Sequence, residues 1–233
     1  TSAGFLKEAQ MKKAEIIPAI LPRDFSELED KTSLILGAVK TVQIDVCDGQ
    51  FVPNASWPYR KHDNNFDLLL SEDIGLPSWE EVNYEFDLMV NNPEEVVSDW
   101  LRVGASRIII HLESKGDISK AIDLVAGEVE IGLAINIETD IDKLEEYKDK
   151  IQFVQCMGID RIGFQGQTFD DKVIQKIKSI HAKYPDLVIS IDGGVSLDNA
   201  KDLIMAGATR LVVGSAIFDS DNVFDAVEKF KAI

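Results

Sequence analysis

The sequence predicts an α/β fold, a single (β/α)8 barrel of the TIM type. Apolar β-rich runs alternate with amphipathic stretches along the whole chain. Three junctions between a helix and the next strand repeat one pattern, Gly-Ala-x-(Lys/Arg), starting at Gly37, Gly104 and Gly207. Each Gly suits the left-handed position that ends a helix. A repeated βα unit within 233 residues favours one closed barrel over two unrelated domains.

The elements follow one another in a regular order. A strand is predicted where a run is apolar and β-rich, and a helix where the apolar residues are spaced along one face. The predicted strands cover residues 15–21, 41–46, 82–89, 107–112, 130–135, 153–157, 187–191 and 210–213. The predicted helices cover residues 25–36, 93–103, 118–126, 141–148, 171–184, 197–206 and 223–231. Residues 15–233 therefore form the predicted barrel, and residues 1–14 an N-terminal extension, either native or partly derived from an expression tag.

The segment of residues 55–81 is irregular. It contains Trp57, Tyr59 and Trp79, a charged cluster at residues 60–63 and a short apolar run at residues 66–70. We expect one short helix and an extended loop. Because the segment leaves the carboxyl end of a strand, where barrel active sites lie, it is either a surface insertion or a lid or oligomer contact.

Composition excludes several classes of partner. The net charge of −17 argues against nucleic acid and anionic membranes. No apolar run has the roughly 18 residues that a membrane span needs, and the N-terminus has no secretory pattern. The two cysteines, Cys47 and Cys156, form no metal or redox motif. We expect a cytoplasmic homo-oligomer without a nucleotide or organic cofactor.

The stretch Val42–Asn54 reads as a strand that runs into a loop. Alternation places Gln43, Asp45 and Cys47 on one face. Burying Asp45 is costly unless it has a partner; the alternative is a strand-end Asp that caps a turn. Asp192 follows the seventh predicted strand, on the opposite side of a closed barrel, so we expect the two carboxylates to face each other. Such a pair can remove a proton from one face of a carbon and return it to the other.

Glycines follow the last two predicted strands, in Ile191-Asp-Gly-Gly-Val195 and Val213-Gly-Ser-Ala-Ile-Phe218. In barrels this pair of loops commonly binds phosphate; the alternative is two tight turns without a ligand. Other inward-facing positions are Asp87 with Met89 on the third strand, Met157 on the sixth and Asn136 on the fifth. His111 could make a polar contact there, although a structural histidine is the commoner outcome.

Together these residues resemble the ribulose-phosphate 3-epimerase family from residue 16 to residue 218. The resemblance lies in the motifs that begin at Pro18, Asp45, Asp87, Gly132, Gly163, Asp192 and Gly214. It implies an isomerase that inverts one carbon of a pentulose 5-phosphate through an enediolate, with a divalent metal held by two His and two Asp. It also implies that Asp45 and Asp192 are both metal ligands and the acid and base.

The resemblance assigns roles to further positions. It implies phosphate contacts at Gly193, Gly194, Gly214 and Ser215. It implies substrate contacts in a loop over the site and on a sulfur-lined floor, at Gly163, Phe164, Gln165, Gly166, Met89, Met157, Cys47 and Asn136.

The departures from the family fall at the site. Gln43 and Asp87 stand where the family has its two metal-binding His, and Ala19 replaces a Ser that contacts substrate. The loop at residues 157–163 is one residue longer than the family pattern and lacks its Pro. The metal ligands would be Gln43, Asp45, Asp87 and Asp192, an all-oxygen set that favours Mg²⁺, Mn²⁺ or Ca²⁺ over Zn²⁺. Without a cation the three carboxylates repel one another, so one would be protonated or the epimerase reaction would be lost.

Two functions follow from this site. The first is an isomerase acting on a phosphorylated ketose. The second is a non-catalytic or repurposed barrel that binds a phosphosugar without the usual metal. A related lyase is disfavoured, because no Lys follows Asp45 at the Asp-x-Lys-x-x-Asp spacing and the sixth strand carries no Schiff-base Lys.

Overall fold

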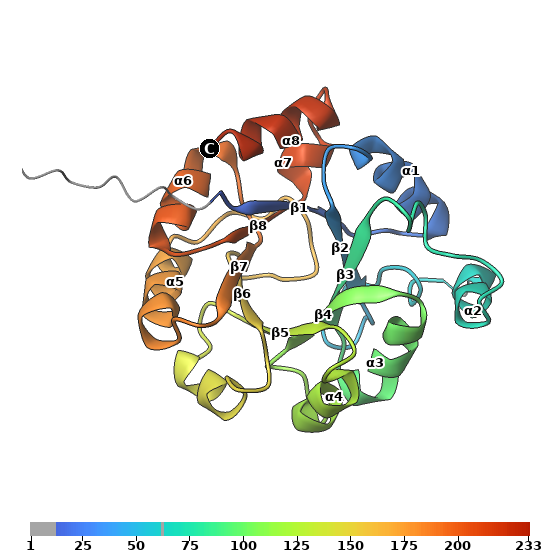
Figure 1. The fold of residues 1–233 in the computed structure, drawn as a ribbon, viewed down its shortest axis with the longest axis horizontal. Coiled ribbons are helices and arrows are strands. Elements are labelled where there is room, and N and C mark those ends of the chain that lie inside the picture. The colour runs from blue at the N-terminus through green and yellow to red at the C-terminus, as the bar shows by residue number, and fades with distance from the viewer. Residues whose placement is uncertain (1–12, 62) are drawn as a thin grey trace, which may run out of the picture.

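The computed structural model describes residues 13–61 and 63–233. Its centre is a closed barrel of parallel strands in the order β1 to β8, surrounded by helices (Figure 1). The strands are β1 Glu15–Ile20, β2 Thr41–Cys47, β3 Asn83–Met89, β4 Ala105–His111, β5 Glu130–Ile135, β6 Phe153–Met157, β7 Val188–Asp192 and β8 Arg210–Val213. The predicted (β/α)8 barrel is therefore confirmed. The predicted extension at residues 1–14 lies almost wholly outside the described residues.

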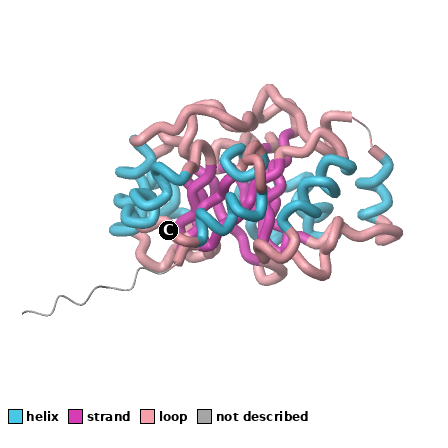
Figure 2. The backbone as a smooth tube through the Cα atoms, turned by 90° about the horizontal axis from the view of Figure 1, so that it is seen from above, coloured by secondary structure: helices cyan, strands magenta, loops and turns pink. Residues whose placement is uncertain are grey.

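The helices form the outer layer, and the side view shows them on both sides of the strands (Figure 2). They are α1 Phe25–Ile35, α2 Asn64–Leu70, α3 Pro93–Arg102, α4 Ile118–Val125, the 3₁₀ helix η1 Ile141–Glu146, α5 Lys172–Lys183, α6 Leu197–Ala206, α7 Ser215–Phe218 and α8 Val223–Lys231. Polar side chains begin several of them; Asp24, for example, accepts a hydrogen bond from the Glu27 amide. Among the described residues no helix is both long and apolar enough to cross a membrane.

The predicted elements and the structure differ at two places. The segment at residues 141–148 is a 3₁₀ helix, because its bonds, such as Tyr147 N–H to the Leu144 carbonyl, span three residues. The short α7 was not predicted. The insertion at residues 55–81 does hold one short helix, α2, as expected.

The repeated glycine junctions behave as the sequence predicts. Gly37, Gly104 and Gly207 have φ values of 75°, 103° and 122°. An L side chain is strained in this left-handed region, whereas Gly is not. Each residue turns the chain from a helix into the next strand and so sets the spacing of the barrel.

A cluster of charged side chains lies at the amino ends of the strands and closes that end of the barrel. This floor cluster consists of Glu15, Glu85, Arg107, Glu130 and Arg210. Arg107 lies 3.1 Å from Glu15, 3.4 Å from Glu85 and 2.9 Å from Glu130. Arg210 lies 2.7 Å from Glu130. Burial raises the pKa of Glu85 to about 7, against the opposing charge of Arg107. Charged groups thus fill the end of the barrel opposite the strand-exit loops.

Candidate active site

The site lies at the carboxyl ends of the strands. A cavity of about 50 Å³ opens there. It is lined by Ala19, Asp45, Met89, Met157, Ile159, Gly163, Phe164, Gln165, Gly166, Gln167, Asp192, Gly193, Gly194, Val195, Val212, Gly214 and Ser215. The structure thus gathers most of the residues that the sequence singled out around one small space.

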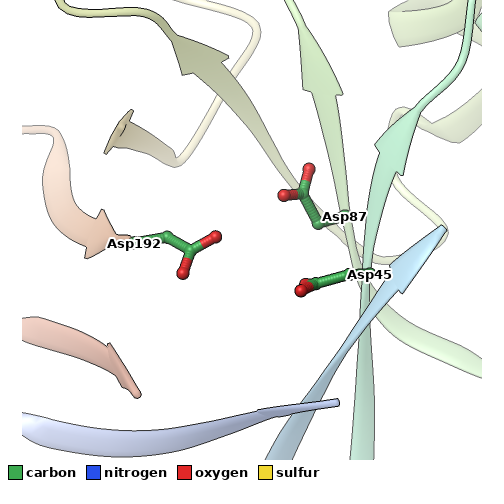
Figure 3. A group of neighbouring side chains, drawn as sticks. All are labelled: Asp45, Asp87 and Asp192. Atoms are coloured by element: carbon green, nitrogen blue, oxygen red, sulfur yellow. The ribbon is translucent and has the colours of Figure 1, made fainter. Parts of the chain in front are cut away.

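Three aspartates converge beside this cavity: Asp45 and Asp192 line it, and Asp87 is fully buried next to them. Asp45 on β2 and Asp87 on β3 are register partners, which places them side by side. Asp192 ends β7 and reaches them from across the barrel (Figure 3). One carboxylate oxygen of each lies within 4.8 Å of the others. Strand alternation on β2 and barrel closure between β2 and β7 therefore produce the predicted convergence of Asp45 and Asp192.

Gln43 bridges two of these acids. Its Nε2 donates a hydrogen bond of 2.8 Å to Asp45 Oδ1 and one of 3.3 Å to Asp192 Oδ2. Its Oε1 is buried and has no partner among the described residues. The amide N–H₂ thus stands between the two carboxylates, while the amide oxygen is left unsatisfied.

Burial and mutual repulsion shift the protonation of the acids. Burial, and then the charges of Asp192 and Asp87, raise the pKa of Asp45 well above its usual range. Burial, and then the charge of Asp87, raise the pKa of Asp192 to about 7. The Gln43 hydrogen bonds oppose both shifts only in part. Like charges this close cannot all be ionised without a counter-charge, so near neutral pH the Asp45–Asp192 pair retains a proton.

Asp87 is held from its other side. Its Oδ1 lies 3.0 Å from His111 Nε2, and its Oδ2 accepts a hydrogen bond of 3.3 Å from Gln155. Burial lowers the pKa of His111, but the charge of Asp87, the hydrogen bond to Asp87 and the nearby Glu113 carboxylate outweigh burial and raise it to about 10. A buried imidazolium therefore faces Asp87 at neutral pH.

The two glycine loops lie beside the acids. Gly193 and Gly194 have φ values of 98° and 70°. A Cβ added at Gly194 would lie 2.9 Å from the Phe169 Cα. Gly214 and Ser215 lead from β8 into α7 and line the same cavity. The backbone of both loops is thus closely packed. At the glycines no side chain separates this backbone from the cavity.

Two of the predicted substrate contacts lie apart from this cavity. Cys47 is buried behind it, with its Sγ 3.9 Å from Met89 Sδ. Asn136 lines a neighbouring hollow with Phe164 and Phe51. Met89, Met157 and the four residues of Gly163–Gly166 all line the cavity itself.

Comparison with known proteins accounts for this arrangement. The sequence model of the ribulose-phosphate 3 epimerase family matches residues 15–218. The chain belongs to this family. A ribulose-phosphate 3-epimerase of Serratia marcescens is 32% identical over 216 residues, covering 89% of this chain and 97% of its own. The enzyme of Escherichia coli K12 is 28% identical, covering 95% of this chain and 96% of its own. The enzyme of Bacillus subtilis is also 28% identical, covering 93% of this chain and 98% of its own.

Solved structures share the fold at lower identity. A 3-hexulose-6-phosphate synthase from Salmonella typhimurium superimposes with a TM-score of 0.69 at 12% identity, covering 94% of this chain and 97% of its own. KGPDC from Streptococcus mutans gives a TM-score of 0.65 at 15% identity, covering 94% of this chain and 96% of its own. These likenesses show the barrel alone.

The ribulose-phosphate 3-epimerase family uses a divalent metal, and the residues of this chain fit one. Asp45, Asp87 and Asp192 could hold a cation, and all three offer oxygen atoms. Burial and the repulsion between these carboxylates raise the pKa of Asp45 and of Asp192, and a bound cation would offset that repulsion. The unsatisfied Oε1 of Gln43 could supply a fourth oxygen after a rotation of the amide. Oxygen donors of this kind suit hard cations.

His111 is the functional residue that sequence reasoning did not assign. The position of His111 at the end of β4, next to the strand that carries Asp87, indicated that its side chain could lie near the site. What the sequence did not indicate is that Asp87 and His111 contact each other.

Proposed function

We propose that this chain is an epimerase of a phosphorylated ketose, in which Asp45 and Asp192 are the paired acid and base. The observation that carries the proposal is the approach of these two carboxylates from opposite sides of the barrel, linked through Gln43 Nε2 at 2.8 Å and 3.3 Å. Membership in the ribulose-phosphate 3-epimerase family supports the substrate class.

The chemistry needs one ionised and one protonated carboxyl group. The ionised one takes the proton from the carbon next to the ketone, and the bond electrons move to the carbonyl oxygen to give an enediolate. The protonated one then gives its proton to the opposite face of that carbon.

The remaining residues hold the substrate. Backbone N–H groups of Gly193, Gly194, Gly214 and Ser215 would bind the phosphate. Because the glycines have no side chains, the phosphate oxygens could approach these N–H groups closely. The loop Gly163–Gly166 would cover the substrate and exclude water. A hard divalent cation on Asp45, Asp87, Asp192 and the Gln43 carbonyl, Mg²⁺, Mn²⁺ or Ca²⁺ rather than Zn²⁺, would supply electrostatic stabilisation of the enediolate oxygens.

Replacing either acid tests the proposal. Asp45→Asn and Asp192→Asn should each lower the exchange of substrate hydrogen for solvent deuterium in ribulose 5-phosphate by roughly 100-fold or more. Asp123→Asn, which changes an exposed carboxylate on α4, is the matched control and should keep the wild-type rate. Turnover that survives both active-site replacements would show that the paired-carboxylate mechanism is wrong.

A second function has one specific observation in its favour. Gln43 satisfies Asp45 and Asp192 with a neutral amide, so the acids have a partner without any cation. This suits a barrel that binds a phosphosugar without metal chemistry. Titration with Mn²⁺ followed by calorimetry separates the two functions, because tight binding that Asp87→Ala abolishes would argue against the non-catalytic barrel.

A further inference from the structure

The cavity is narrow in this structure. Its volume of about 50 Å³ is far below the roughly 300–1,000 Å³ of ordinary ligand clefts. The loop between β6 and α5, residues 158–171 and hereafter the cover loop, forms one wall, because residues 163–167 line the cavity. A phosphorylated sugar fits only if a wall of the cavity moves, and the cover loop is a wall that belongs to no helix or strand.

Two side-chain amides fasten the cover loop to the barrel rim. Asn54 Nδ2 donates a hydrogen bond of 2.9 Å to the Gly163 carbonyl. Gln165 Nε2 donates one of 3.1 Å to the carbonyl of Ala19, at the end of β1. The first contact is made by the exit loop of β2, and the second is made by the cover loop itself.

The Gln165 amide also lies against the β8 exit. A Cβ added at Gly214 would lie 3.0 Å from Gln165 Nε2 and 3.5 Å from its Cδ. The side chain therefore occupies space beside Gly214, one of the backbone positions proposed for the phosphate. A phosphate at that position and the amide in its present place exclude each other in part.

Glycines give this side chain freedom to change place. Gly163 and Gly166, on either side of Gln165, have φ values of 81° and 70°. A Cβ added at Gly166 would meet nothing within 4 Å, so this turn faces open space. The chain thus has room to move on the Gly166 side of Gln165, whereas Gly163 is packed against Val52.

We infer that Gln165 is an anion-responsive latch, a residue that determines how the site accepts a phosphorylated ligand. Without a ligand its N–H₂ holds the cover loop shut on the Ala19 carbonyl. The loop opens to admit the ligand; when a phosphoryl group then binds beside Gly214, the amide takes a phosphate oxygen in place of that neutral acceptor, and the cover loop shuts again over the ligand. The exchange is favourable because hydrogen bonds to ionised acceptors are about twice as strong as neutral ones. The identity of the anion rests on the proposed function.

Limited trypsin digestion measures the latch without turnover. Arg161 is an exposed residue of the cover loop, and cleavage after it gives fragments 1–161 and 162–233. The readout is the rate of this cut relative to all other cuts in the same chain, which separates loop opening from global unfolding. The probe ligand is inorganic phosphate.

Three variants separate the parts of the inference. Gln165→Ala should raise the relative rate at Arg161 about three- to tenfold, the effect of one lost hydrogen bond, and phosphate should no longer protect the site. Asn54→Ala should raise the rate similarly but keep protection by phosphate, because Asn54 contacts the Gly163 carbonyl and not the glycine loops. Gln175→Ala, on the exposed face of α5, should match the wild type in both respects.

Two results would overturn the inference. One is a Gln165→Ala protein that is cut at Arg161 no faster than Gln175→Ala. The other is equal protection by phosphate in Gln165→Ala and wild type, which would mean that the amide does not take a phosphate oxygen. Failure of the proposed function would instead appear as absent turnover with the digestion pattern as expected.

Discussion

His111 Nε2 lies 3.0 Å from Asp87 Oδ1 in the barrel interior, and both side chains are wholly buried. The pair turns Asp87 into a carboxylate with a protein counter-charge. Asp45 and Asp192 have only the neutral Gln43 amide as a direct side-chain partner among the described residues. The three acids of the site therefore have unequal surroundings, and Asp87 alone contacts an imidazole, from the neighbouring strand β4.

Removing the imidazole should leave a buried charge without its partner. His111→Ala is expected to lower the free energy of unfolding by about 3–5 kcal/mol, measured by urea denaturation. His111→Gln keeps an N–H donor and should cost less. Replacing the exposed His181 with Ala is the control and should change stability little. Equal losses for His111→Ala and His181→Ala would contradict a structural role for the pair.

The ligand set should determine metal preference. The double replacement Gln43→His and Asp87→His introduces two imidazoles and removes one carboxylate. We expect preference to move from Mg²⁺ and Mn²⁺ towards Zn²⁺, since imidazole suits Zn²⁺ and carboxylate suits harder ions. Competition between metals, followed by calorimetry, measures the change. An unchanged order of affinities would show that these two positions do not contact the cation.

Gly194 should be intolerant of a side chain for two reasons. Its φ is 70°, and a Cβ would lie 2.9 Å from the Phe169 Cα. Gly194→Ala is expected to lower both stability, by about 1–3 kcal/mol, and the affinity for inorganic phosphate. Gly127→Ala is the matched control, since its φ is 85° but a Cβ there meets nothing within 4 Å. It should lower stability alone, and loss of phosphate binding in both variants would refute the local explanation.

The floor cluster should make stability depend on pH. The folded-state pKa of Glu85, about 7, is above its ordinary value of 4.5. The folded protein therefore binds the proton more tightly than the unfolded chain between these values, and stability falls as pH rises from about 4.5 to 7. Glu85→Gln should flatten this part of the profile, as seen by urea denaturation at about pH 5 and about pH 7. A slope identical to that of the wild type would contradict the assignment.

The sequence predicted the strands to within about two residues, because parallel strands buried on both faces have continuous β-branched runs. It also indicated Asp45 and Asp192, since alternation and barrel closure are regular. It did not predict the interactions of Gln43, His111 and Gln165. Each depends on a partner from another segment, and side-chain direction at that scale follows from packing and not from periodicity. The homo-oligomeric state and cytoplasmic location stay predictions.

The floor cluster has a consequence for how this barrel can change over evolutionary time. Arg107 and Arg210 tie together the amino ends of β1, β3, β4, β5 and β8. Closure of the barrel is thus secured on the amino-terminal side of the aspartates, where Glu85 precedes Asp87 by two residues on β3. Substitutions around the aspartates can then accumulate without opening the scaffold. The two ends of one barrel can diverge at different rates, one under selection for integrity and the other for chemistry.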